Sequence, residues 1–174
     1  MRRFGLVLGL SVIIICLKAQ DNYSSENMNP YFGQKPPGMI PEIFAPGIVS
    51  DPDTHEFSGT FSPDGSEYYF YRFTEDSPLR FYYTKLVDGD WTTPEEFPMT
   101  TEYGASAPHI PFDNSKLYFM WRHPVPEGQP NLPSFFYVER TPDGWSEPKY
   151  AGQGMFMSSS RDGEFYTTDM SMYD

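Results

Sequence analysis

The sequence has little cysteine and little basic charge. Its one cysteine, Cys16, lies in an apolar run near the N-terminus, so the rest of the chain has no thiol for disulfides or thiol chemistry. The fold must therefore be held together by its apolar core. Lys and Arg number 12 against 24 Asp and Glu, which gives a formal net charge of −12. Because basic side chains supply most of the affinity for nucleic acids, no nucleic-acid partner is expected.

The chain also lacks the sequence motifs of common catalytic sites. No Gly-x-Ser-x-Gly nucleophile elbow is present. The three histidines, His55, His109 and His123, have no histidine four residues away and no cysteine neighbour, so they do not follow the spacing of metal ligands. We therefore expect no catalytic residue, no metal and no cofactor.

The N-terminus has the pattern of a secretory signal peptide. Arg2 and Arg3 precede an apolar run over residues 4–17, and cleavage after Ala19 would remove residues 1–19. The run is shorter than the roughly 20 apolar residues that a membrane-spanning helix needs, so no stable membrane anchor is expected. The pattern predicts export to the periplasm or the extracellular space.

A lipoprotein is the less favoured form of this export. Cys16 lies at the end of the apolar run, where acylated lipoproteins carry their cysteine. Ile15 precedes it, whereas a lipoprotein signal needs a small residue at that position.

Aromatic and turn-forming residues are abundant in the rest of the chain. The sequence contains 15 Phe, 13 Tyr and 3 Trp beside 18 Pro and 14 Gly, a composition that favours short strands over helices. Residues 20–40 are polar and rich in proline without periodicity, which predicts an extended leader. The folded part is expected over residues 41–174.

One ten-residue pattern recurs along that part. An aspartate turn joins two strand-like runs at residues 61–70, again at 110–119 and again at 159–166, with Asp64, Asp113 and Asp162 each 49 residues apart. Asp, Asn and Gly form such turns because they hydrogen-bond locally or accept positive φ. The predicted structural turn residues are Asp64, Gly65, Asp113, Asn114, Asp162 and Gly163.

A fixed period of this length with four short strands per repeat is typical of a β-propeller blade. The sequence predicts an all-β propeller of four-stranded antiparallel blades, with blade 1 at about 55–98, blade 2 at about 103–150 and the start of blade 3 at about 152–174. Trp91 and Trp145 follow the second turn of their repeats, where packing between blades is expected.

About three blades are fewer than the four to eight of a closed propeller. The chain is therefore expected to be an incomplete or open propeller. Two explanations remain open: an N-terminal fragment of a longer protein, which we favour, or a ring completed by self-association.

The sequence FSPDG at residues 61–65, followed by YYFYR at 68–72, resembles the WD40-like PD40 repeat of TolB-type propellers. The resemblance extends over about 41–174 and is weaker in the second and third repeats. It implies an exported, non-catalytic propeller that acts as a binding or protein-interaction module. The alternative is the propeller part of an exported enzyme, such as a polysaccharide lyase or a serine peptidase.

Two arginines are the best candidates for ligand binding. Arg72 and Arg122 each end the second strand of a repeat, and strand ends lie at a face of a propeller. With Trp121 and His123 they could form a rim suited to a protein or carbohydrate partner, because guanidinium groups bind carboxylates and aromatic rings stack on flat ligands. The other interpretation is structural, with both arginines bonded to carbonyls or carboxylates of the neighbouring blade.

Overall fold

The computed structural model describes residues 30–75, 77–170 and 172. The predicted signal peptide and the first half of the predicted leader lie outside these residues. The prediction of an all-β fold is confirmed: within the described residues the strands form antiparallel sheets, and the helical segments are the short 3-10 turns η2 (Pro30–Gly33) and η3 (Pro98–Thr100). No helix in this part of the chain has the length and apolar character needed to cross a membrane.

The first sheet is built from β1 (His55–Phe61), β2 (Glu67–Thr74) and β3 (Ser77–Val87) in that order. Two short strands, β4 (Asp90–Trp91) and β5 (Glu95–Glu96), both pair with β3. Residues 92–94 separate these two strands. Pro94, between β4 and β5, has no N–H to donate to the neighbouring strand, so the hydrogen-bond ladder with β3 is interrupted there.

The second sheet repeats this plan in residues 105–153. Its strand order is β10 (Lys149–Gln153), β8 (Ser134–Thr141), β7 (Lys116–Trp121) and β6 (Ala105–His109), with β9 (Gly144–Trp145) also paired to β8. A third pair of strands, β11 (Ser158–Ser159) and β12 (Phe165–Tyr166), forms a hairpin of its own. Neither larger sheet closes on itself.

The period of 49 residues is also present in the backbone conformation. The turn residues Gly65, Asn114 and Gly163 have φ values of 73°, 56° and 89°. Before each turn, the non-glycine residues Ser58, Ala107 and Phe156 have positive φ values of 41°, 49° and 55°, again 49 residues apart. In β1 and β6 this residue lies in a bulge, where the register shifts between Phe57 and Thr60 and between Ser106 and His109.

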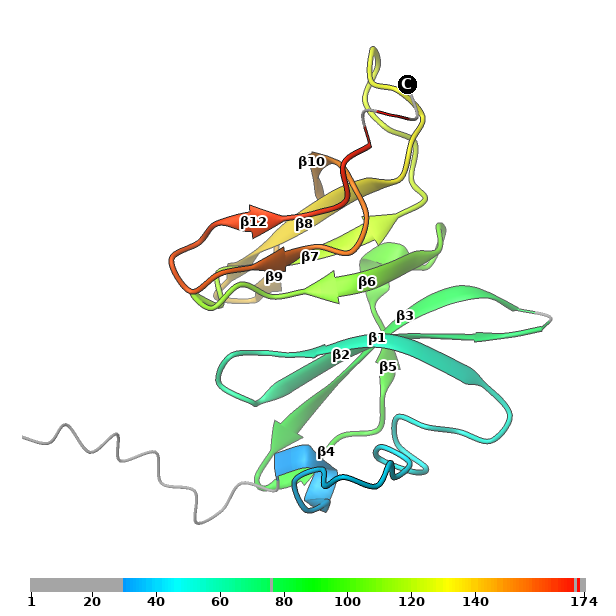
Figure 1. Ribbon diagram of the computed structural model, residues 1–174, viewed down its shortest axis with the longest axis vertical. Helices are drawn as coiled ribbons and strands as arrows, with labels where there is room; N and C mark the ends of the chain where they lie inside the picture. The colour runs from blue at the N-terminus through cyan, green and yellow to red at the C-terminus, as the bar shows by residue number, and fades with distance from the viewer. Residues whose placement is uncertain (1–29, 76, 171, 173–174) are drawn as a thin grey trace, which may run out of the picture.

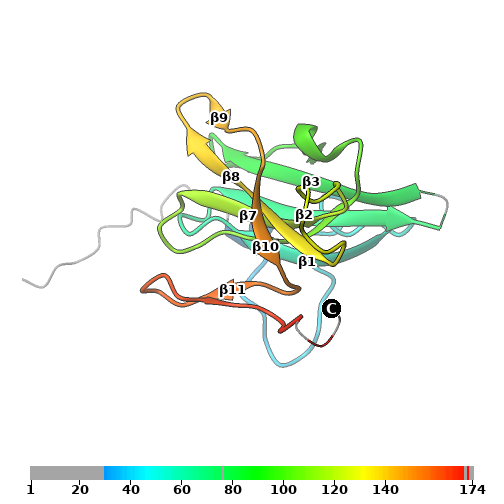
Figure 2. The same ribbon diagram turned by 90° about the horizontal axis from the view of Figure 1, so that it is seen from above.

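The sheets pack face to face as successive layers (Figures 1 and 2). Between the two larger sheets lies a core of buried residues: Tyr69, Phe81 and Phe97 from the first, and Ala105, Ile110, Leu117, Phe119, Phe136 and Val138 from the second. Alternation along each strand sends neighbouring side chains to the opposite face. Phe165 of the third hairpin contacts Tyr118 on the far face of the second sheet, with ring centroids 5.1 Å apart.

A polar network crosses the interface between the two larger sheets. The Tyr69 hydroxyl donates to Glu67 Oε2 at 3.1 Å and accepts from Trp145 Nε1 at 3.1 Å. Arg140 donates to the same Glu67 oxygen at 2.6 Å, and its guanidinium lies 4.2 Å from the Trp145 ring centroid. Each buried polar group in this network therefore has a partner, as burial requires.

The N-terminal segment covers the other face of the first sheet. Ala45 and Val49 are buried against Tyr68 and Phe70. Phe32, inside the predicted leader, stacks on Trp91 with ring centroids 4.2 Å apart. Tyr31 also contacts Phe61, with ring centroids 6.2 Å apart, and Gln34 hydrogen-bonds the Ile43 carbonyl and the Ala45 amide, so part of the predicted leader packs against the folded chain.

The bulge conformation predicts that replacing two alanines of β6 by glycine changes the stability of the fold to different extents. Ala107→Gly relieves the cost of a left-handed L-residue while losing one methyl group, so its stability should stay within about 0.5 kcal/mol of the parent. Ala105 is buried in regular strand, and Ala105→Gly should cost about 1.5 kcal/mol from backbone entropy and lost burial. Urea unfolding of both variants measures the difference. Equal losses would contradict the bulge geometry.

Candidate ligand-binding rim

Arg72 has a structural role in this fold. Its Nε bonds Glu56 Oε1 at 3.1 Å, and its Nη2 donates to the carbonyls of Ile48 and Val49 at 3.1 and 2.8 Å. The side chain is only 18% exposed. Arg72 therefore links the N-terminal segment to the first sheet, and its partners lie in that segment and in β1 rather than in a neighbouring blade.

Trp121 and His123 are brought together at the end of β7. Their rings stack with centroids 4.3 Å apart. Trp121 Nε1 donates to the Tyr103 carbonyl at 3.2 Å, and His123 Nδ1 lies 2.8 Å from the Pro124 carbonyl. A carbonyl can only accept, so Nδ1 of His123 is the donor in this contact. Both rings are thus fixed in orientation by backbone contacts.

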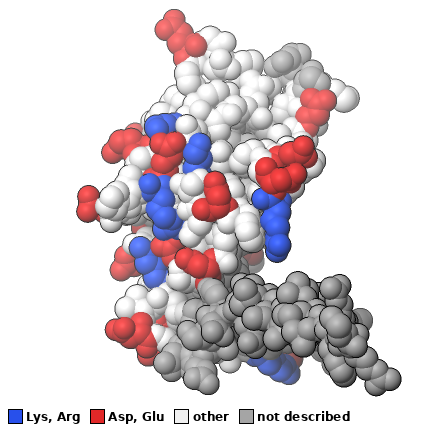
Figure 3. Space-filling view, turned by 90° about the vertical axis from the view of Figure 1, so that its left-hand side faces the viewer, with Lys and Arg blue, Asp and Glu red and all other residues white. Residues whose placement is uncertain are grey.

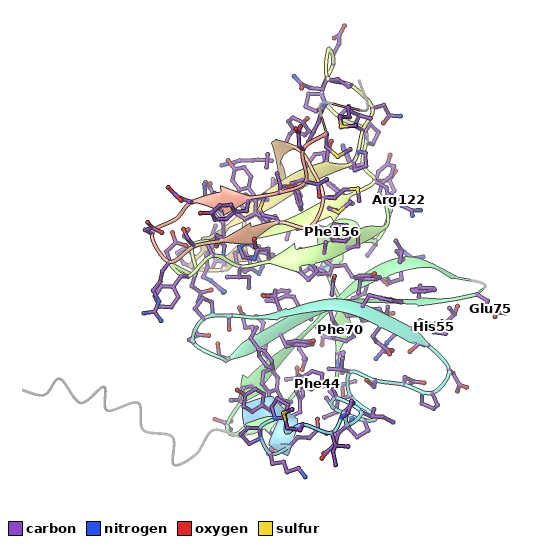
Figure 4. All side chains as sticks on the ribbon, in the orientation of Figure 1. Phe44, His55, Phe70, Glu75, Arg122 and Phe156 are labelled. Carbon is purple, nitrogen blue, oxygen red and sulfur yellow. The ribbon has the colours of Figure 1, made fainter. Side chains whose placement is uncertain are left out.

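Arg122, between them, is exposed and extends from the end of the second sheet (Figure 4). Its backbone N–H donates to the Gly104 carbonyl at 3.0 Å, which fixes the residue beside β6. Within residues 30–75, 77–170 and 172, no hydrogen bond or ion pair engages its guanidinium. The N–H donors of the Arg122 guanidinium are therefore available to a ligand.

Trp121, Arg122 and His123 line one cavity of about 380 Å³, which we call the rim pocket. The other lining residues come from β3, from β6 and the residue before it, from β7, and from the loop into β8 and its first residue: Leu79, Gly104, Ser106, Met120, Val125, Asn131, Leu132, Pro133 and Ser134. At Gly104 a Cβ atom would lie 3.2 Å from the Leu79 carbonyl oxygen, so glycine allows the two sheets to approach closely here.

The rim pocket thus contains three of the four predicted binding residues, and Arg72 lies elsewhere. Asn131 and Ser106 were missed by sequence reasoning. One signal pointed to this region: Trp91 and Trp145 are 54 residues apart, five more than the repeat period, which places an insertion in the loop after His123. Functional residues gather on such loops.

The six predicted turn residues form three similar turns. The amide of Gly65, Asn114 or Gly163 donates to the carbonyl three residues earlier at 2.8, 2.9 and 3.2 Å. Asp113 accepts the Ser115 amide at 3.1 Å, and this hydrogen bond lowers the pKa of the Asp113 carboxyl. The Asp64 carboxylate accepts the Ser66 amide in the same way at 3.0 Å. Asp64 and Asp113 therefore each stabilise their own turn through a local hydrogen bond.

No cluster of three His, Cys, Asp or Glu side chains placed to hold a metal ion occurs in the described part of the chain. Comparison with family models, with curated proteins and with solved structures gives no match. The resemblance to the PD40 repeat therefore stays a prediction that rests on residues 61–72.

The contacts of the two arginines predict different costs of substitution. Arg72→Gln removes an ion pair and two hydrogen bonds from a largely buried guanidinium, so it should destabilise the fold by about 2–3 kcal/mol. Arg122→Gln should change stability by no more than about 0.5 kcal/mol, because its guanidinium has no described partner. Guanidinium chloride unfolding distinguishes the two. A comparable loss for Arg122→Gln would show that Arg122, too, supports the fold.

Proposed function

We propose that this chain is an exported, non-catalytic β-propeller that acts as a binding or protein-interaction module. Residues 55–98 and 103–150 would be its first two blades, and the β11–β12 hairpin would begin the third. The proposal of export rests on the signal-peptide pattern at residues 1–19.

Three observations support the propeller. The two larger sheets share one strand order and pack face to face. The bulges and turns recur at a constant spacing of 49 residues with the same backbone conformation. Trp145 reaches across to the preceding sheet and bonds Tyr69, so a repeated tryptophan joins one layer to the layer before it. Successive blades of a propeller pack in this way.

The binding role rests on the Arg122 guanidinium in the rim pocket, which forms no hydrogen bond or ion pair with the described residues. Charge-assisted hydrogen bonds from arginine to a carboxylate can be bidentate, which sets both affinity and orientation. The stacked Trp121 and His123 rings offer a flat surface beside it, and Asn131 and Ser106 offer further polar contacts. The pocket therefore suits a carboxylate on a flat or ring-shaped body, such as an acidic sugar or an acidic side chain of a protein partner.

A titration of the isotope-labelled protein with D-glucuronate, followed by NMR, tests this role. Glucuronate should shift the Trp121 indole and Arg122 resonances with millimolar affinity, while neutral D-glucose should shift them far less. Arg122→Gln should weaken glucuronate binding by at least about tenfold, because one charge-assisted contact contributes roughly 1.5–3 kcal/mol.

Lys35→Gln is the matched control, because it removes the same charge from an exposed site in the N-terminal segment, where Lys35 pairs with Glu42. Equal weakening by both variants would indicate a general charge effect. That result, or equal binding of glucose and glucuronate, would overturn the proposed site. N-acetylglutamate amide in place of glucuronate tests a protein carboxylate in the same way.

A further inference from the structure

A second hollow, of about 370 Å³, lies at the other end of β6 from the rim pocket. We call it the turn-end hollow, because it lies where the aspartate turns of the three repeats come together. Two repeat positions supply its walls, each with one residue per repeat at a spacing of 49: Phe61, Ile110 and Ser159 at the first, and Pro63, Phe112 and Arg161 at the second.

The third repeat departs from the other two at both positions. Phe61 and Ile110 are apolar where Ser159 is a hydroxyl, and Pro63 and Phe112 are apolar where Arg161 is a cation. The first two repeats show that the fold does not require polar residues here. The turn-end hollow consequently has apolar walls on two sides and a polar wall on the third.

His109 adds a third polar group to that wall, beside Ser159 and Arg161. Its Nε2 lies 2.8 Å from Ser159 Oγ, so the pair joins β6 to β11 inside the hollow. His109 is half-buried, and this burial lowers the pKa of its imidazole, which keeps the ring neutral at neutral pH. The corresponding residues of the first and third repeats are Thr60 and Ser158, so histidine occurs at this repeat position in the second repeat alone.

Arg161 provides the positive charge of the hollow. Its guanidinium lies 4.7 Å from the centroid of the Phe112 ring, whose residue is 58% exposed. No hydrogen bond or ion pair to this guanidinium exists within the part of the chain that the structure describes. Figure 3 shows this end of the molecule, where Lys and Arg side chains gather among carboxylates; Arg140 and Lys149, for example, pair with Glu67 and Glu139.

We propose that the turn-end hollow binds a small aromatic carboxylate. The carboxylate would bond Arg161 and the Ser159 hydroxyl, and the ring of the ligand would lie against Phe112 and Pro63, since the Phe61 ring packs on Phe32 and Tyr68 of the cluster behind the first sheet. The apolar walls favour a ring over a polar body, and the volume is within the range of small-molecule sites. The site is separate from the rim pocket and goes beyond the proposed function.

Phenylacetate and its neutral analogue 2-phenylacetamide are the probes, and NMR of the isotope-labelled protein is the readout. Phenylacetate should shift resonances of His109, Phe112 and Ser159, and the amide should bind at least tenfold more weakly. Arg161→Gln should weaken phenylacetate binding by at least tenfold, and Ser159→Ala by a few-fold. Both side chains lie at the surface of the hollow, so the variants should keep the fold, which their NMR spectra verify.

Lys35→Gln is again the charge-matched control and should bind phenylacetate like the parent protein. Arg161→Gln should still bind glucuronate, which keeps this test distinguishable from that of the rim pocket. The proposal would be overturned if phenylacetate shifted no residue of the hollow, if the amide bound equally well, or if Lys35→Gln weakened binding as much as Arg161→Gln.

Discussion

The packing of the first sheet on the second is the contact on which the rest of the molecule depends. Tyr69 lies at its centre, with a fully buried ring between the two sheets and a hydroxyl bonded on both sides. Burial, together with the nearby Glu67 carboxylate, raises the pKa of this hydroxyl and keeps it a donor. An apolar interface alone would allow the two sheets to slide past each other. The hydrogen bond from the Trp145 indole to Tyr69 fixes their relative position, because displacing Trp145 would leave buried polar groups without partners.

Both proposed sites follow from this stacking. The rim pocket combines Leu79 of the first sheet with residues of the second, and the turn-end hollow collects equivalent positions from three layers. If the repeats were identical, each repeat would contribute the same side chains to a site. Both sites instead depend on departures from it: the insertion after His123 in one, and Ser159 and Arg161 in the other. The guanidinium groups of Arg122 and Arg161 form no hydrogen bond or ion pair within the described residues, whereas Arg72 and Arg140 bond neighbouring elements and support the fold.

The local pattern of the sequence was sufficient for much of the fold. The recurring pattern predicted two strand-like runs joined by a turn at residues 110–119, and the structure has β7 (Lys116–Trp121) after that turn and a positive φ at Asn114. Tertiary contacts explain what was missed. Phe32 lies in a polar segment without periodicity, and only tertiary contacts with rings distant in sequence, such as Tyr68 and Trp91, give it a place to pack. Arg72 does not end its strand but lies inside β2, where at the 49-residue period it corresponds to Trp121, and the N-terminal segment supplies carbonyls to its guanidinium; Arg122 follows the end of β7.

A double-mutant cycle on Tyr69 and Trp145 tests the central claim that this contact joins the two sheets. The free energies of unfolding of the parent, Tyr69→Phe, Trp145→Phe and the double variant would be measured by urea denaturation. Because the two side chains share a hydrogen bond across the interface, the coupling energy should be about 1 kcal/mol, and the losses should not add. Additive losses, with a coupling near zero, would show that the two sheets are not joined through this contact and would contradict the stacked arrangement.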